Sequence, residues 1–126
     1  SKRARQPGRD SDESHGKEEE KMLTIRFRAG GGYLSLHMDG HATGSPAVCA
    51  GASALACTLA GWLDRHGAEA DSRLEAGTGA VRCRDTAEAR TAFEVVAVGL
   101  AMLAEAHPDK VQILGKTTGV FPAWMW

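Results

Sequence analysis

Two glycine-centred hairpins, each followed by an apolar helix, limit the possible folds of this chain more than any other feature. In the first hairpin, residues 23–28 and 33–38 alternate between apolar and polar side chains around the turn Gly30-Gly31-Gly32. A period of two is typical of strands with one apolar and one polar face. The apolar face is predicted to carry Leu23, Ile25, Phe27, Leu34, Leu36 and Met38. His37 falls on the opposite face, so we expect it to point away from the core.

The first helix is predicted to begin at Ser45-Pro46 and to run to about Arg65. Serine is a favoured N-cap residue, and proline is tolerated at the first helical position because that amide has no partner within the helix. Gly67 is expected to end the helix. Its core face is predicted from the helical spacing of Val48, Ala52, Leu55, Leu59 and Trp62.

The second hairpin is predicted from residues 72–76 and 80–84, joined at Gly77-Thr78-Gly79. Asp85 and Glu88 are spaced as a capping pair for a second helix, which should end before Pro108. Its core face is predicted to carry Ala89, Phe93, Val96, Leu100 and Leu103. With a last strand at 110–114, the order β-β-α-β-β-α-β predicts an α+β fold. Two helices should pack on one face of a mostly antiparallel sheet.

The two ends of the chain are predicted to lie outside this folded domain, which we place at residues 22–115. Residues 1–21 contain no large apolar side chain and are expected to be a disordered leader or an expression-derived tail. The codons for Lys17-Glu18-Glu19 can contain the ribosome-binding sequence AAGGAGG just before Met22, so Met22 is expected to be the natural start. The aromatic segment 116–126 is either an extra tail or a peptide that docks in an apolar groove.

Composition excludes several functional classes. A formal net charge of −1 argues against the basic surface that nucleic-acid binding requires. The three cysteines form no CxxC pair, which fits neither a disulfide framework nor a usual zinc site and favours a reducing cytoplasm. No uninterrupted apolar run of about 18 residues and no signal peptide is evident, so we expect a cytoplasmic protein without a membrane span.

His41 and Cys49 are the residues with the clearest chemical potential. Cys49 is predicted in the first turn of the helix, where unpaired N–H groups favour a thiolate, and further N–H groups there can stabilise an oxyanion. His41 lies across the loop and can reach the sulfur as base and acid. Spacing alone also allows two ordinary core residues, or a zinc site completed by another thiol. Cys57 and Cys83 are predicted to be buried core residues.

A family resemblance bears on this choice. The pieces "GHA" at 40–42 and "VCAGASAL" at 48–55 resemble the ribosomal-processing cysteine protease family of small bacterial proteins. That family combines Gly-His-Ala, a mobile loop and Val-Cys-Ala with a serine four residues after the cysteine. The segment "GLAMLAEAHPDKVQIL" at 99–114 is similar to the family's second helix and last strand.

The resemblance implies a cytosolic cysteine endopeptidase that removes the N-terminal extension of a large-subunit ribosomal protein, acts as a homodimer and needs no cofactor or metal. It assigns His41 as base, Cys49 as nucleophile and Ser53 as a supporting polar residue. The substrate loop is expected at Ala42, Thr43, Gly44 and Ser45. This loop is shorter than is usual in the family, and Pro46 replaces a common acidic residue. The alternatives are a phage-type relative with another substrate, or a non-catalytic dimerisation or peptide-binding module.

Overall fold

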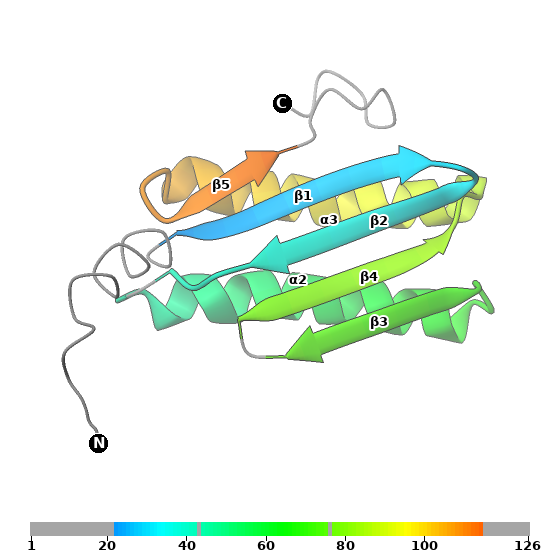
Figure 1. The fold of residues 1–126 in the computed structure, drawn as a ribbon, viewed down its shortest axis with the longest axis horizontal. Coiled ribbons are helices and arrows are strands. Elements are labelled where there is room, and N and C mark those ends of the chain that lie inside the picture. Colours follow the sequence, from blue (N-terminus) through cyan, green and yellow to red (C-terminus); the bar gives the residue numbers. More distant parts are fainter. Residues whose placement is uncertain (1–21, 43, 76, 115–126) are drawn as a thin grey trace, which may run out of the picture.

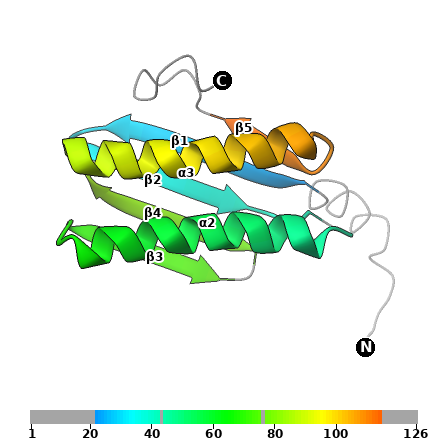
Figure 2. The same cartoon turned by 180° about the vertical axis from the view of Figure 1, so that it is seen from behind.

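The computed structural model describes residues 22–42, 44–75 and 77–114, so the predictions for 1–21 and 116–126 lie outside the described residues. Within them the element order is the predicted one: β1 (Leu23–Gly30), β2 (Tyr33–Asp39), α2 (Pro46–Arg65), β3 (Ala70–Glu75), β4 (Thr78–Arg84), α3 (Ala87–Ala106) and β5 (Val111–Leu114). Both helices lie on the same face of one sheet, as comparison of Figures 1 and 2 shows. The predicted α+β architecture is therefore confirmed.

The described strands form a mixed sheet in the order β3-β4-β2-β1-β5. Strands β1 to β4 pair with antiparallel neighbours, and β5 pairs in parallel with β1 from Leu23↔Val111 to Arg26↔Leu114. The predicted alternation in the first hairpin is confirmed, because all six residues of its apolar face are buried. The β3–β4 turn is tighter than predicted, since Thr78 and Gly79 already belong to β4.

The core lies between the sheet and the two helices. Helix α2 has the predicted bounds, but its buried residues are Val48, Ala52, Ala56, Leu59 and Leu63. Leu55 and Trp62, predicted for the core face, are only partly buried. At two of the five positions, the buried residue is thus the one that follows the predicted residue: Ala56 in place of Leu55, and Leu63 in place of Trp62. Hydrophobic spacing located the helix, but the sheet beneath it determines which side chains become inaccessible.

The start of α3 differs from the predicted capping pair. Thr86 is the N-cap, and its hydroxyl accepts a hydrogen bond from the Ala89 N–H at 3.1 Å. Asp85 instead accepts two hydrogen bonds from the Arg90 guanidinium, each 2.6 Å long. The capping prediction was wrong by one residue, because both Asp85 and Thr86 are suitable caps and the pair with Arg90 engages the aspartate.

The α3 core face is largely as predicted, with Ala97 buried and Leu103 partly buried. By length and composition alone, α2 is apolar enough to cross a membrane, contrary to the expectation that no segment of the chain is. Its alanine and leucine content accounts for this. In the folded chain its buried side chains pack on the sheet, as those of a core helix do.

Candidate active site

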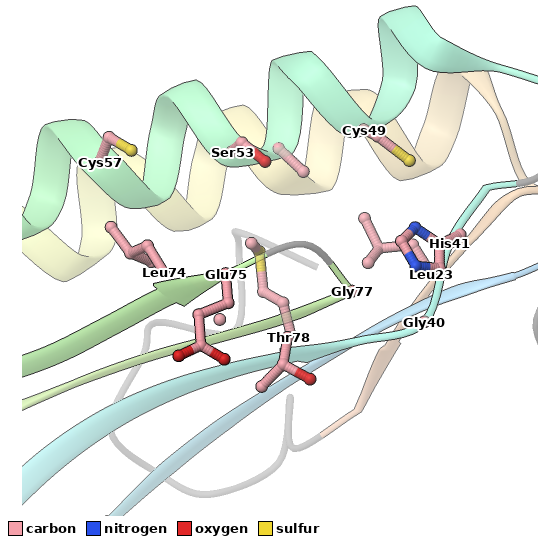
Figure 3. A pocket seen from close by; sticks show the side chains of 13 residues that line it. Leu23, Gly40, His41, Cys49, Ser53, Cys57, Leu74, Glu75, Gly77 and Thr78 are labelled. Carbon is pink, nitrogen blue, oxygen red and sulfur yellow. The ribbon is translucent and has the colours of Figure 1, made fainter.

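A cavity of about 290 Å³ lies between α2 and the β3–β4 hairpin. Helix α2 contributes Cys49, Ser53 and Cys57 along one side, as Figure 3 shows. The opposite wall comes from β3, β4 and the segment after β2. The other lining residues are Leu23, Met38, Gly40, His41, Ala52, Leu74, Glu75, Gly77, Thr78 and Gly79. The structure therefore brings His41, Cys49 and Ser53 to one cavity.

Cys49 lies in the first turn of α2 and is half-buried. The Ala42 N–H donates a hydrogen bond to its Sγ at 3.3 Å. The nucleophilic form of cysteine is the thiolate, and an N–H group aimed at the sulfur is a suitable hydrogen-bond donor to it. Ser45 is the N-cap as predicted, although its side chain makes no capping hydrogen bond.

The amides of this first turn are less available than predicted. Both the Val48 and Cys49 N–H groups already donate to the Ser45 carbonyl, at 3.0 and 3.3 Å. They are therefore not free to bind an oxyanion in this arrangement. The amide that contacts the sulfur is instead the Ala42 N–H, which no pattern in the sequence marks.

His41 follows β2 by two residues, and its side chain is exposed to solvent. In Figure 3 the imidazole lies next to Cys49, at the end of the cavity formed by Gly40 and Gly77. No hydrogen bond joins the imidazole to the sulfur in this arrangement of the two described side chains. The thiol and the imidazole are thus neighbours in one cavity, and their direct contact remains a prediction.

Ser53 and Cys57 follow Cys49 at intervals of four residues, so they lie on the same side of α2. Both side chains are exposed, and both line the cavity. The prediction that Cys57 is a core residue was wrong, because the adjacent Ala56 occupies the buried position. The prediction for Cys83 is confirmed, since it is fully buried on β4. Burial raises the pKa of the Cys83 thiol, and the Asp85 carboxylate raises it further.

The predicted substrate loop connects β2 to α2. Ala42 is buried, with 3% of its surface exposed, and its carbonyl accepts the Ser45 N–H at 2.9 Å. Gly44 is exposed and adopts a positive φ of 81°, while Thr43 lies outside the described residues. One end of the loop is therefore anchored beside the thiol.

Residues of the β3–β4 hairpin were missed as part of the site. Leu74, Glu75, Gly77 and Thr78 line the cavity, yet the sequence identified this segment only as a strand and the turn that follows it. The local pattern carries no signal of this role, because the sheet order brings the turn to the site. Among residues 22–42, 44–75 and 77–114, no group of three potential His, Cys, Asp or Glu metal ligands is found.

Comparison with known proteins identifies the family of this chain. The family model for the cysteine protease Prp matches residues 22–112. The chain belongs to the Prp family. The Prp match thus covers both halves of the His-Cys motif, and family membership supports a cysteine peptidase. No protein of curated function matches the chain.

Several solved structures resemble this Prp family member. The essential ribosomal processing protease Prp from S. aureus, in complex with a covalently linked product peptide, is 25% identical with a TM-score of 0.63. That match covers 73% of this chain and 97% of the S. aureus chain. The same enzyme with a substrate peptide gives 23% identity and a TM-score of 0.60 over the same shares of the two chains. A protein from Streptococcus mutans is 24% identical with a TM-score of 0.55. That match covers 75% of this chain and 98% of the S. mutans chain.

Proposed function

We propose that this protein is a cysteine endopeptidase in which Cys49 is the nucleophile and His41 the general base and acid. The observation that carries the proposal is the placement of the Cys49 thiol beside the His41 imidazole, in one cavity of a Prp-family fold. The Ala42 N–H directed at Sγ supports it further.

In this scheme His41 takes the thiol proton, and Sγ attacks the scissile carbonyl carbon. The tetrahedral intermediate collapses as the C–N bond breaks, and His41 returns the proton to the leaving amine. The product is a thioester on Cys49. A water molecule, deprotonated by His41, then attacks the thioester carbonyl and releases the carboxylic acid and the free thiol.

The shape and lining of the cavity support a proposal for how a peptide is held. It extends along α2 from Cys49 past Ser53 to Cys57, and Leu74 of β3 faces the helix across it. Its apolar lining includes Leu23, Met38 and Ala52. Such a channel suits an extended peptide with apolar side chains next to the cleaved bond. Ser53 is proposed to contact the thiol or the bound peptide.

The proposed substrate is the N-terminal extension of a large-subunit ribosomal protein. Support comes from the S. aureus relative, a ribosomal processing protease whose structures hold substrate and product peptides. We further propose a cytoplasmic homodimer, and that residues 42–45 order around the substrate. Light scattering of the purified protein tests the dimer.

Cleavage of an extended ribosomal protein, followed by mass spectrometry, tests the proposed activity. Wild type should yield one new N-terminus, and Cys49→Ala and His41→Ala should be inactive but folded by circular dichroism. Cleavage by Cys49→Ala would contradict the assignment of the nucleophile. If the folded wild type binds the peptide without cleaving it, the chain is a peptide-binding module. Cleavage of a different protein only would indicate a relative with another substrate.

A further inference from the structure

The turn between β3 and β4 contacts the proposed catalytic imidazole directly. A Cβ atom built on Gly77 would lie 2.7 Å from Nε2 of His41, 3.2 Å from Cε1 and 3.5 Å from Cδ2. The first distance is shorter than a carbon and a nitrogen that are not bonded can approach. The imidazole therefore packs against the Gly77 backbone, in a space that any side chain at position 77 would occupy.

A hydrogen bond holds the same two segments together. The Gly40 N–H donates to the Gly77 carbonyl at 3.1 Å, one residue before His41. Gly40 itself has φ of +90°, and a Cβ there would lie 2.6 Å from the Met22 carbonyl oxygen. The backbone that carries His41 is thus held closely between the start of β1 and the β3–β4 turn.

The exposure of His41 makes this contact important for its position. An exposed side chain has few neighbours to select one rotamer, and a general base must lie within hydrogen-bonding reach of the proton it takes. The His41 imidazole faces the cavity that Cys49 also lines. Gly77 packs against the imidazole at the end of that cavity.

We propose that Gly77 is a positioning residue, whose lack of a side chain allows the His41 imidazole to occupy the place from which it serves Cys49. This inference rests on the proposed function. It predicts that a single methyl group at position 77 displaces the ring. A displacement of about 1 Å at a reacting group can cost on the order of 10²-fold in rate.

The other hairpin supplies a matched control. Gly32, in the β1–β2 turn, has φ of +83°, and a Cβ built there meets nothing within 4 Å. Gly77 has φ of +80°. Alanine at either position thus adds a similar backbone strain, because both need a left-handed conformation. Only alanine at 77 adds a contact with His41.

The experiment compares Gly77→Ala with Gly32→Ala in the full chain. Three quantities are measured: the unfolding midpoint, kcat and KM for the cleaved peptide, and the imidazole ¹H–¹³C NMR signals of His41. We expect similar losses of stability in the two variants. Gly77→Ala should lower kcat on the order of 10²-fold with little change in KM, and should shift the His41 signals. Gly32→Ala should leave kcat and those signals near wild type.

Equal kcat values in the two variants, or unchanged His41 signals in Gly77→Ala, would overturn the proposal. The His41 NMR signals report the position of the ring even if the wild type proves inactive. Failure of the proposed function can therefore be distinguished from failure of the proposal for Gly77. If Gly77→Ala does not fold, the double variant Gly77→Ala/His41→Ala is tested. Recovery of folding without the imidazole supports the contact, and no recovery shows that Gly77 serves the turn alone.

Discussion

At the scale of single residues, the three cysteines occupy three different environments. Cys49 is half-buried and accepts a hydrogen bond from the Ala42 N–H. Cys57 is exposed two helical turns later, and Cys83 is buried in the core with a pKa raised by desolvation. Because only the thiolate is a good nucleophile, exposure and charge together set the reactivity of each thiol.

These environments predict the order of alkylation by iodoacetamide in the native protein. Cys49, beside the proposed base His41, should react fastest, Cys57 more slowly, and Cys83 only on unfolding. Mass spectrometry of digested samples, taken over time and pH, measures the three rates separately. Labelling of Cys83 at the rate of Cys57 would contradict the burial of Cys83 in the core, and the Cys49→Ser variant controls for misassigned peptides.

Ser53 should contribute less to activity than the proposed dyad. Its side chain lines the cavity one turn after Cys49 and has no part in bond formation in the proposed scheme. Loss of one hydrogen bond is worth up to about tenfold in rate. We therefore expect Ser53→Ala to lower kcat/KM by no more than about tenfold, with Thr58→Ala on the same helix as control. Complete inactivity of folded Ser53→Ala would mean that the hydroxyl is essential.

At the scale of elements, the start of α3 combines a side-chain cap with an ion pair. Thr86 caps the helix. Arg90, one turn into the helix, forms an ion pair with the carboxylate of Asp85, which precedes Thr86. The Arg90 hydrogen bonds hold the pKa of Asp85 below its ordinary value. A carboxylate with a lowered folded-state pKa stabilises the fold at pH values above its unfolded-state pKa, and this is lost as the pH falls.

This sign gives a pH prediction for Asp85→Asn. The variant should unfold at a lower temperature than wild type at neutral pH, because the charged pair is absent. The difference in unfolding temperature between the variant and wild type should shrink as the pH falls below about 3.8, the ordinary pKa of an aspartate. It should shrink further as the pH approaches the lower pKa that Asp85 has in the folded protein. Calorimetry from pH 7 to pH 3 measures this difference, with Asp64→Asn on α2 as control. A difference that is constant with pH would show that the pair stabilises through shape and not charge.

At the scale of the whole molecule, one core between the sheet and the helices holds the site together. Cys49 comes from α2, His41 from the segment after β2 and Gly77 from the β3–β4 turn, so their geometry depends on the packing of α2 and α3 on the sheet (Figure 2). Phe93 of α3 is among the largest fully buried side chains of this core.

The variant Phe93→Ala should therefore destabilise the whole fold. Truncating a buried phenylalanine leaves a cavity and costs about 3–5 kcal/mol. Val95, on the same helix, is 66% exposed, so Val95→Ala should change the free energy of unfolding by no more than about 0.5 kcal/mol. Urea denaturation of the two variants measures both values. Equal losses would place Phe93 outside the cooperative core.

The sequence alone was sufficient for every element and for most buried faces, because strand and helix periodicities are local properties of the chain. The two-part motif around His41 and Cys49 is also a local feature of the chain, but its meaning came from the resemblance to a known family. Local rules failed where several residues suited one role: Thr86 and not Asp85 caps α3, and Ala56 and Leu63 are buried on α2 in place of Leu55 and Trp62.

Tertiary structure alone decided three further features. It paired β5 in parallel with β1, exposed Cys57 in the cavity, and brought Gly77 against His41. Gly77 lies far from His41 along the chain, and the antiparallel pairing of β2 with β4 places Asp39 opposite Thr78. The two segments meet because the end of β2 lies beside the start of β4, a long-range pairing that no local pattern in the sequence contains.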